Sequence, residues 1–366
     1  MTIIQRLPLL TVRRVALHTI IEKGNNDTCA TVEHDQELLS ASDEIITMLL
    51  GRVVEAAGRQ TKSFSLEIAH SQQGSFFDLC EPIKTQTDQE FLRTSSQLAE
   101  KLAAAQTHNR IPSGYFVMLD CSDPSTQLGQ YIVIKAELDE VIHVTRENNV
   151  TRLELLKKVF FGSAKKLYKI GMLFERPQAQ GPLPNDRYEC ILFDDQFNDD
   201  KKPAEYFYSN FLGYSIDRNG KIQTQRFERL VESFGRDHIS DDRRLQDWVD
   251  ALRVELRSQD SLIDPMSFGH RHLHDRDLED QFLAQVVSQL PQAIPKDTSL
   301  ISRRLNQRKV DFPDKIIVSG PSDDFDDKVK IIPPGESLDP LFEEEGEEVT
   351  YTYIRIAGRP YPRKRR

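Results

Sequence analysis

The sequence predicts an α+β fold in which an N-terminal antiparallel sheet with helices is followed by a helical and β C-terminal domain. Two pairs of apolar runs, each joined by a short polar turn, indicate hairpins, and segments of helical periodicity lie between them. The chain has 366 residues, of which 38% are hydrophobic and 29% charged, so it is long enough for two domains with real cores.

The N-terminal half begins with two predicted strands, residues 14–22 and 29–33, joined by the turn "KGNND" into a hairpin. A helix is predicted in "SASDEIITMLLGRVVEAA", where Ser42 is a suitable N-cap and apolar residues recur at helical spacing. A second helix, "TDQEFLRTSSQLAEKLAAAQ", leads into "GYFVMLDC" and "QYIVIKAEL", which the link "SDPSTQLG" joins as a second hairpin. Antiparallel pairing is therefore expected throughout this unit.

The next predicted strand is "YECILFDD", followed by two helical segments on either side of a break at Gly213. A third helical region starts with Ser240 as a cap and carries an apolar stripe that includes Trp248. We expect the domain boundary just before it, near Gly235, which gives domains 1–235 and 236–366. Beyond Pro291 the runs "DKIIVSG", "DKVKIIPPG" and "VTYTYIRIAG" predict strands.

Composition excludes several classes of protein. The formal net charge of −10 argues against a protein that coats nucleic acid over its whole surface, so any such contact must use local basic patches. No apolar run approaches the roughly 20 residues of a membrane helix, and the chain is expected in the cytoplasm. The cysteines, Cys29, Cys80, Cys121 and Cys190, form no CxxC pair and are expected to be reduced, buried thiols.

Motifs for catalysis and phosphate binding are missing: the sequence has no GxGxxG, GxxxxGK[ST], GxSxG or HExxH. Lys135 on one apolar run and Asp120 at the end of the preceding one suggest a metal-dependent nuclease, but Val133 stands where a carboxylate would be needed. We therefore expect a nonenzymatic protein with no cofactor, and the nuclease is the lowest-ranked alternative.

Two groups of residues could suggest a metal. The histidines of "SFGHRHLHDRD", His270, His272 and His274, converge only on a strand, and the polar surroundings instead predict a turn or short helix between two helices. The aspartates of "FDDQFNDD" lack the glycine of a calcium loop and fit a solvated loop. No metal site is expected from either group.

Basic residues gather in three segments: 152–169, 302–309 and the tail 359–366. Lysines on a helix most often form a solvated face, but three such segments in an acidic chain favour contact with the phosphates of DNA, independent of sequence. The residues expected to bind DNA are Lys157, Lys158, Lys165, Lys166, Lys169, Arg303, Arg304, Arg308, Lys309, Arg363, Lys364, Arg365 and Arg366.

The order of segments resembles the bacterial nucleoid-associated protein family of the NdpA or YejK type. The similar stretches are the opening "VALHTIIEKGNNDTCATVEHD" through "KSFSLE", the central "KKLYKIGMLFE" with "YECILFDDQFNDDKKPAEYFYSNFLGYSID", and "IPKDTSLISRRLNQ". The resemblance spans nearly the whole chain and implies a protein of the bacterial nucleoid that contacts double-stranded DNA and, in relatives, type II topoisomerases. It carries over no catalytic residues.

Topoisomerase subunits and a second copy of the chain are thus further candidate partners. An alternative is an adaptor that reaches DNA only through a partner, because its acidic surface and the loop 343–348 can compete with nucleic acid for a basic protein. The histidine-rich segment, the insertion "SLDPLFEEEGEE" and the long basic tail depart from the family pattern, which leaves open a relative belonging to a mobile element or defence system.

Overall fold

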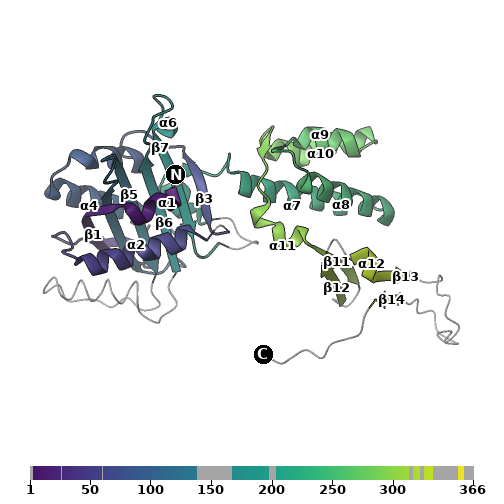
Figure 1. Cartoon of the computed structure of the whole chain (residues 1–366), viewed down its shortest axis with the longest axis horizontal. Helices are drawn as coiled ribbons and strands as arrows, with labels where there is room; N and C mark the ends of the chain where they lie inside the picture. Colours follow the sequence, from purple (N-terminus) through teal and green to yellow (C-terminus); the bar gives the residue numbers. More distant parts are fainter. Residues whose placement is uncertain are drawn as a thin grey trace.

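A computed structural model shows two lobes, with the N-terminal sheet in one and a group of helices in the other (Figure 1). The structure describes residues 3–25, 27–59, 61–137, 167–197, 203–312, 316–321, 325–332 and 353–357. None of the helices in these ranges is both long and apolar enough to cross a membrane.

The N-terminal lobe is built on one antiparallel sheet with the strand order β2-β1-β4-β5-β6-β7-β3-β8. The sheet confirms both predicted hairpins, because β1 pairs with β2 and β4 pairs with β5. Its strands are β1 (Thr11–Ile21), β2 (Thr31–Glu33), β3 (Ser63–Ile68), β4 (Gly114–Ser122), β5 (Gly129–Glu137), β6 (Leu167–Glu175), β7 (Tyr188–Asp194) and β8 (Tyr214–Ser215).

Helices cover both faces of the sheet, and every residue of β4 is buried as a result. On one face lie α1 (Ile3–Arg6), the short helix η1 (Leu7–Leu9) and α2 (Asp43–Ala57), which follows Ser42 as predicted. On the other face lie α3 (Phe76–Cys80), η2 (Glu81–Thr85), α4 (Asp88–Ala105) and the π-helix η3 (Tyr206–Phe211). A short helix α6 (Pro184–Arg187) precedes β7.

Local sequence explains the ends of these helices. Thr87 accepts a hydrogen bond from the N–H of Glu90 while the Glu90 side chain accepts one from the N–H of Thr87, so a capping box starts α4. The predicted break at Gly213 is confirmed, since its φ of +68° is the left-handed conformation that glycine adopts most readily. Three cysteines, Cys80, Cys121 and Cys190, are free and buried as expected, whereas Cys29 is half-buried.

The C-terminal lobe packs α7 (Gly220–His238), α8 (Asp242–Arg257), α9 (Pro265–His272) and α10 (Arg276–Gln285) around an aromatic core. Trp248 of α8 contacts Phe234, Phe268 and Phe282, and its indole N–H donates to the carbonyl oxygen of Val231 at 2.9 Å. Two short strands, β9 (Leu262–Ile263) and β10 (Ile294–Pro295), pair at one end of the helices.

Two details of this lobe differ from the sequence-based expectation. Asp241, not Ser240, is the N-cap of α8, and its carboxylate accepts the N–H of Arg244 at 2.8 Å. The expected domain boundary near Gly235 falls inside α7, whose last turns pack against α8. We propose that the division between the lobes lies in residues 216–219, before α7 begins.

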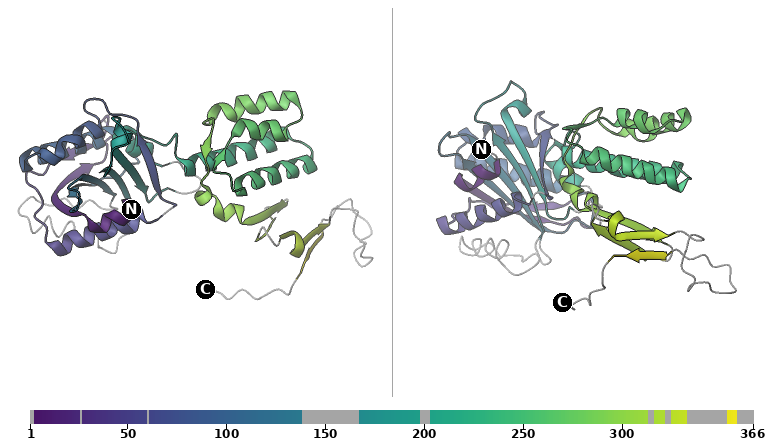
Figure 2. Two further views of the ribbon diagram at one scale, coloured as in Figure 1. Left: turned by 45° about the horizontal axis from the view of Figure 1, so that its top comes forward. Right: turned by 45° about the vertical axis from the view of Figure 1, so that its right-hand side comes forward.

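The lobes meet at the edge of β3, beside β8 (Figure 2). The side chain of Asn219 donates to the carbonyl oxygen of Ser65 at 2.7 Å, and the ammonium of Lys221 donates to that of Ser63 at 3.2 Å. Burial lowers the pKa of Lys221 from its ordinary value. The start of α7 thus covers strand carbonyls that would otherwise form an open sheet edge.

Two helical glycines predict opposite responses to alanine. A Cβ at Gly235 would lie 2.5 Å from Cδ1 of Trp248, whereas a Cβ at Gly51 of α2 would meet no atom within 4 Å. Alanine is the better helix former by about 1 kcal/mol, so Gly51→Ala should stabilise the protein by up to that amount. Gly235→Ala should destabilise it by about 1–3 kcal/mol through overpacking. Urea unfolding of the two variants measures this, and equal shifts would contradict the packing.

The chain ends in small elements: η4 (Val287–Gln289), η5 (Thr298–Leu300), α11 (Ser302–Leu305), β11 (Gln307–Phe312), β12 (Ile316–Pro321), α12 (Phe325–Lys328), β13 (Val329–Ile332) and β14 (Tyr353–Ile356). β11 pairs with β12 and β13 with β14, both antiparallel, which confirms the strands expected beyond Pro291.

Candidate nucleic-acid interface

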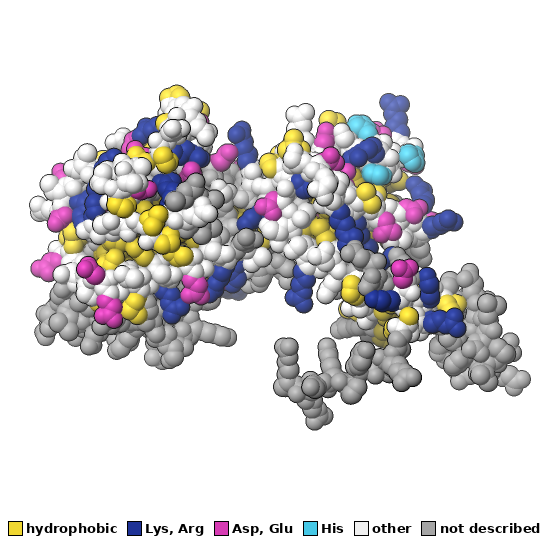
Figure 3. Space-filling model, in the orientation of Figure 1, with side chains coloured by type: hydrophobic (Ala, Val, Ile, Leu, Met, Phe, Trp, Pro, Cys, Tyr) yellow, Lys and Arg dark blue, Asp and Glu magenta, His cyan; other side chains and the backbone are white. Residues whose placement is uncertain are grey.

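A groove in the C-terminal lobe brings four arginines together. It has a volume of about 550 Å³ and lies between α7, α8 and the segment formed by α11 and β11. The four are Arg236 of α7, Arg253 of α8, Arg304 of α11 and Arg308 of β11, and we call this site the arginine groove. Figure 3 shows Lys and Arg side chains gathered on the side of the lobe that carries α8 and the small hairpins.

Buried residues fix the short helix that carries Arg304. Ile301 and Leu305 are buried on either side of Arg304, so α11 is fixed against the helices and its polar residues face outward. The guanidinium of Arg257 donates to the carbonyl oxygen of Leu305 at 2.5 Å, which satisfies the end of this short helix. The backbone beneath the arginines is therefore fixed before any ligand binds.

Each groove arginine already has a partner within the chain. Arg304 contacts Glu228 at 2.6 Å, and this carboxylate is almost completely buried. Arg236 contacts Glu232 at 2.8 Å and Arg253 contacts Asp250 at 3.4 Å, both within one helix. The Arg308 guanidinium lies 5.6 Å from the centre of the Phe325 ring. These contacts orient the guanidinium groups, whose remaining donors can bind the oxygens of a phosphate.

The predicted DNA-binding residues do not all lie at the same site in the structure. Arg304 and Arg308 line the arginine groove, and Arg303 is exposed beside them on α11. Lys309 follows Arg308 on β11. The predicted residues that lie outside the described ranges are Lys157, Lys158, Lys165, Lys166, Arg363, Lys364, Arg365 and Arg366.

Lys169 requires a correction. It is fully buried on β6, where its ammonium lies 3.8 Å from the carboxylate of Asp194 and donates to the side chain of Gln196. Because both faces of the sheet are covered, this lysine cannot reach a phosphate at the surface. The prediction treated it as part of a basic surface segment, whereas it belongs to the interior of the sheet.

Sequence reasoning missed Arg236 and Arg253. Each lies on the polar side of an amphipathic helix, where an arginine is ordinary, and nothing near either residue in the sequence marks it as special. Only the packing of α11 and β11 against α7 and α8 brings them beside Arg304 and Arg308. Arginines more than 70 residues apart in the sequence are brought together only by the tertiary fold.

The structure also shows where the histidines considered as metal ligands lie. His270 and His272 lie in the last turn of α9 and His274 follows it, so a short helix is the geometry of this connector. His270 contacts Glu279 of α10, and burial, with the charge of Arg271, lowers the pKa of His272. Within the described part of the chain, no three His, Cys, Asp or Glu side chains converge as a metal site.

Among the aspartates of "FDDQFNDD", Asp194 is buried and accepts the N–H groups of Gln196 and Ala204, while Asp195 pairs with Arg59 and Lys62. Asp199 and Asp200 lie outside the described residues. Asp194 thus differs from the expected solvated aspartate, because it organises the loop that follows β7.

The residues of the nuclease hypothesis do not meet. In the register of β4 and β5, Asp120 faces Tyr131 while Lys135 faces Phe116, four residues further along the strand. Asp120 is bound by Arg13 and Arg14, and the ammonium of Lys135 donates to the carbonyl oxygen of Pro112 at 2.9 Å. Each group has a structural contact of its own.

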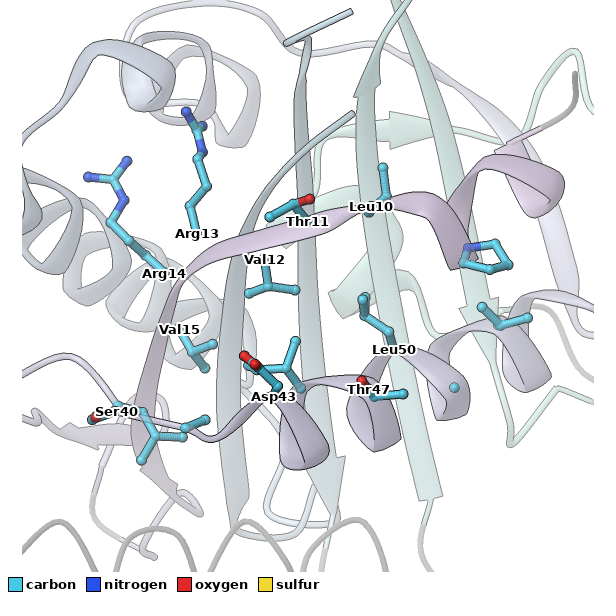
Figure 4. A pocket seen from close by; sticks show the side chains of 16 residues that line it. Leu10, Thr11, Val12, Arg13, Arg14, Val15, Ser40, Asp43, Thr47 and Leu50 are labelled. Atoms are coloured by element: carbon cyan, nitrogen blue, oxygen red, sulfur yellow. The ribbon is translucent and has the colours of Figure 1, made fainter. Parts of the chain in front are cut away.

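A second groove, of about 670 Å³, lies between the start of β1 and α2 (Figure 4). Its lining is mixed, with apolar residues such as Leu10, Val12 and Leu50 beside polar ones such as Thr11 and Asp43. Arg13 and Arg14 point away from α2, as the labelled side chains show, toward the far side of β1. Arg13 and Arg14 line this groove, but their guanidinium groups are held by the buried Asp120, and Asp43 adds a carboxylate, so the arginine groove is the better candidate for nucleic acid.

Comparison with known proteins agrees with the resemblance of the sequence. A family model described as nucleoid-associated protein YejK matches residues 16–299, which is more than half of the chain. A search of curated proteins found no match. The matched residues include the whole sheet of the N-terminal lobe except the start of β1, and helices α7 to α10 of the C-terminal lobe, and they end before α11. The chain therefore belongs to the nucleoid-associated protein YejK family.

Proposed function

We propose that this protein binds double-stranded DNA through the arginine groove and contacts phosphates without reading the base sequence. The convergence of four arginines from three parts of the chain is the observation that carries the proposal. Arginine presents several donors in a planar fork that matches phosphate oxygens, and such contacts position a protein on DNA without specifying sequence. Membership of a nucleoid-associated family supports this partner and a location at the nucleoid in the cytoplasm.

The proposed role is nonenzymatic. The family is described by its association with the nucleoid and not by a reaction. The buried Asp120 and Lys135, which raised the nuclease hypothesis, hold the sheet together instead. Plasmid DNA should therefore remain intact after incubation with the purified protein and Mg²⁺ or Mn²⁺, and nicking that depends on the metal would contradict this part of the proposal.

A salt titration of DNA binding by the purified protein tests the proposal. Four phosphate contacts predict that the logarithm of the binding constant falls with the logarithm of salt concentration with a slope of about −3.6. Duplexes of shuffled sequence should bind with nearly the same affinity, because no base edges are read. Absence of binding at low salt would contradict direct contact with DNA.

A protein-interaction adaptor is the second candidate. The observation that favours it is that Arg304, Arg236 and Arg253 already hold carboxylates, so an acidic segment of a partner fits the same groups. A type II topoisomerase subunit is the partner we propose for this role, and a homodimer is the proposed state of the chain itself. Co-purification with topoisomerase subunits that survives nuclease treatment, without DNA binding by the protein alone, would favour the adaptor.

A further inference from the structure

The ribbon formed by β11 and β12 exposes two isoleucines at one end. In its register Gln307 faces Pro321 at the end nearest α11, and Phe312 faces Ile316 at the far end, which we call the tip. Ile316 is 58% exposed and Ile317 is 55% exposed. None of the six residues of β12 is buried, and apolar side chains at this exposure gain stability only when something covers them.

The other end of the ribbon is anchored and continuous with the arginine groove. Phe325 of α12 is buried against Gly320, where a Cβ would lie 3.2 Å from the Phe325 ring, and the Arg308 guanidinium stacks near the same ring. Gln307, Arg308 and Val310 of β11 line the arginine groove itself. A ligand that fills the groove therefore lies along β11 as far as Val310, and the tip extends about 7 Å beyond that residue.

The second ribbon points to an anionic partner. Lys330 and Arg355 face each other directly across β13 and β14, and both are exposed. Like charges at directly paired positions destabilise a ribbon. Neither side chain forms an ion pair with any residue that the structure describes. The two ribbons lie side by side in Figures 1 and 2, so a ribbon that carries two cations without an ion pair accompanies the one that carries the exposed isoleucines.

We propose that the tip of the β11–β12 ribbon inserts Ile316 or Ile317 into the minor groove of DNA and bends the duplex. This inference rests on the proposed function, since the arginine groove would hold the adjacent phosphates. Apolar side chains that enter the minor groove separate neighbouring base pairs and kink the helix, and the reduced stacking is offset by contacts with the bent DNA. A second copy of the chain is a poorer occupant, because it would bring like cations together.

Two fluorescence measurements test the proposal on the full chain. A short duplex with a donor and an acceptor dye at its ends reports bending, and aminopurine within an A·T-rich duplex reports unstacking. The double variant Ile316→Ala/Ile317→Ala should lower both signals at least about threefold at saturating protein, while its Kd rises less than about tenfold because the phosphate contacts remain. Val254→Ala/Leu262→Ala, which truncates two exposed apolar residues on α8 and β9, is the matched control and should behave as the wild type.

The outcomes separate this inference from the proposed function. Wild-type protein that binds DNA with the expected salt dependence but neither bends nor unstacks it would overturn the inference and leave the proposed function standing. Full bending by the double alanine variant would overturn it in the same way. A wild-type protein that does not bind DNA would remove both. If the double variant instead loses self-association, the tip is an interface between copies and the inference is wrong.

Discussion

Replacing Arg236, Arg253, Arg304 and Arg308 by glutamine is expected to weaken DNA binding by about 1000-fold or more at low salt. Each arginine that binds a phosphate releases counterions, so neutralising all four removes most of the electrostatic free energy of binding. The salt slope should fall toward zero together with the affinity, by about one for each phosphate that is no longer neutralised. Fluorescence anisotropy of a labelled duplex over a range of salt concentrations measures both quantities.

The control must change the net charge equally without touching the groove. Arg52, Arg59, Arg187 and Arg271 suit this purpose, because each is exposed and forms an ion pair with a carboxylate outside the groove. Arg271 pairs with the buried Glu255 much as Arg304 pairs with the buried Glu228, so the two sets are also matched in structural cost. If both quadruple variants lose the same affinity, the effect is one of overall charge and the groove is not the interface.

The sheet could be predicted from sequence because its information is local. The β4–β5 hairpin consists of two apolar runs joined by a turn, and α4 carries its own capping box, so neither needs knowledge of distant residues. The N-cap of α8 was displaced by one residue, to Asp241, because Ser240 and Asp241 are both suitable caps and only the backbone geometry distinguishes them.

The predictions about Lys169 and about the boundary near Gly235 differ from the structure because both features depend on tertiary packing. The run "KKLYK" resembles a basic surface, but strand alternation places Lys169 on the same face as Gly171 and Leu173, and that face is covered by α4 and η3. The boundary near Gly235 is predicted just before the helical region that starts at Ser240. The glycine is instead where α7 and α8 approach closely, since Trp248 occupies the space that a side chain would fill.

Replacing Asp120 by asparagine is expected to lower the free energy of unfolding by about 3–5 kcal/mol, the range seen when one partner of a buried ion pair is removed. The Asp120 side chain is fully buried and accepts hydrogen bonds from Arg13 at 2.5 Å and from Nε of Arg14 at 2.8 Å. The register of β1 against β4 shifts between Val12 and Arg14, so a β-bulge directs both guanidinium groups to one carboxylate. Urea unfolding followed by circular dichroism measures the change.

Arg14 accounts for most of this expected loss. Its side chain is 10% exposed, and its guanidinium also donates to the carbonyl oxygens of Gln86 and Ile83 and lies 4.5 Å from the centre of the Phe91 ring. Held by these contacts, it cannot turn to water when the carboxylate is neutralised, whereas Arg13, at 32% exposure, can. Asp195→Asn removes a more exposed carboxylate that also has two basic partners and should cost less than about 1 kcal/mol.

A double-mutant cycle separates the free energy of the Asp120–Arg14 pair from that of the other contacts that Arg14 makes. If the loss in Asp120→Asn comes from leaving the buried charge of Arg14 with only the exposed carboxylate of Asp88, 3.6 Å away, as a counter-ion, then adding Arg14→Met should recover part of it, because the double variant no longer buries that charge. The recovered free energy would be the cost of isolating the guanidinium, and the remainder the net contribution of the pair and of the Arg14 contacts to Gln86, Ile83 and Phe91. Strictly additive losses would show that Asp120 and Arg14 stabilise the sheet independently, and the bulge would then have some other cause.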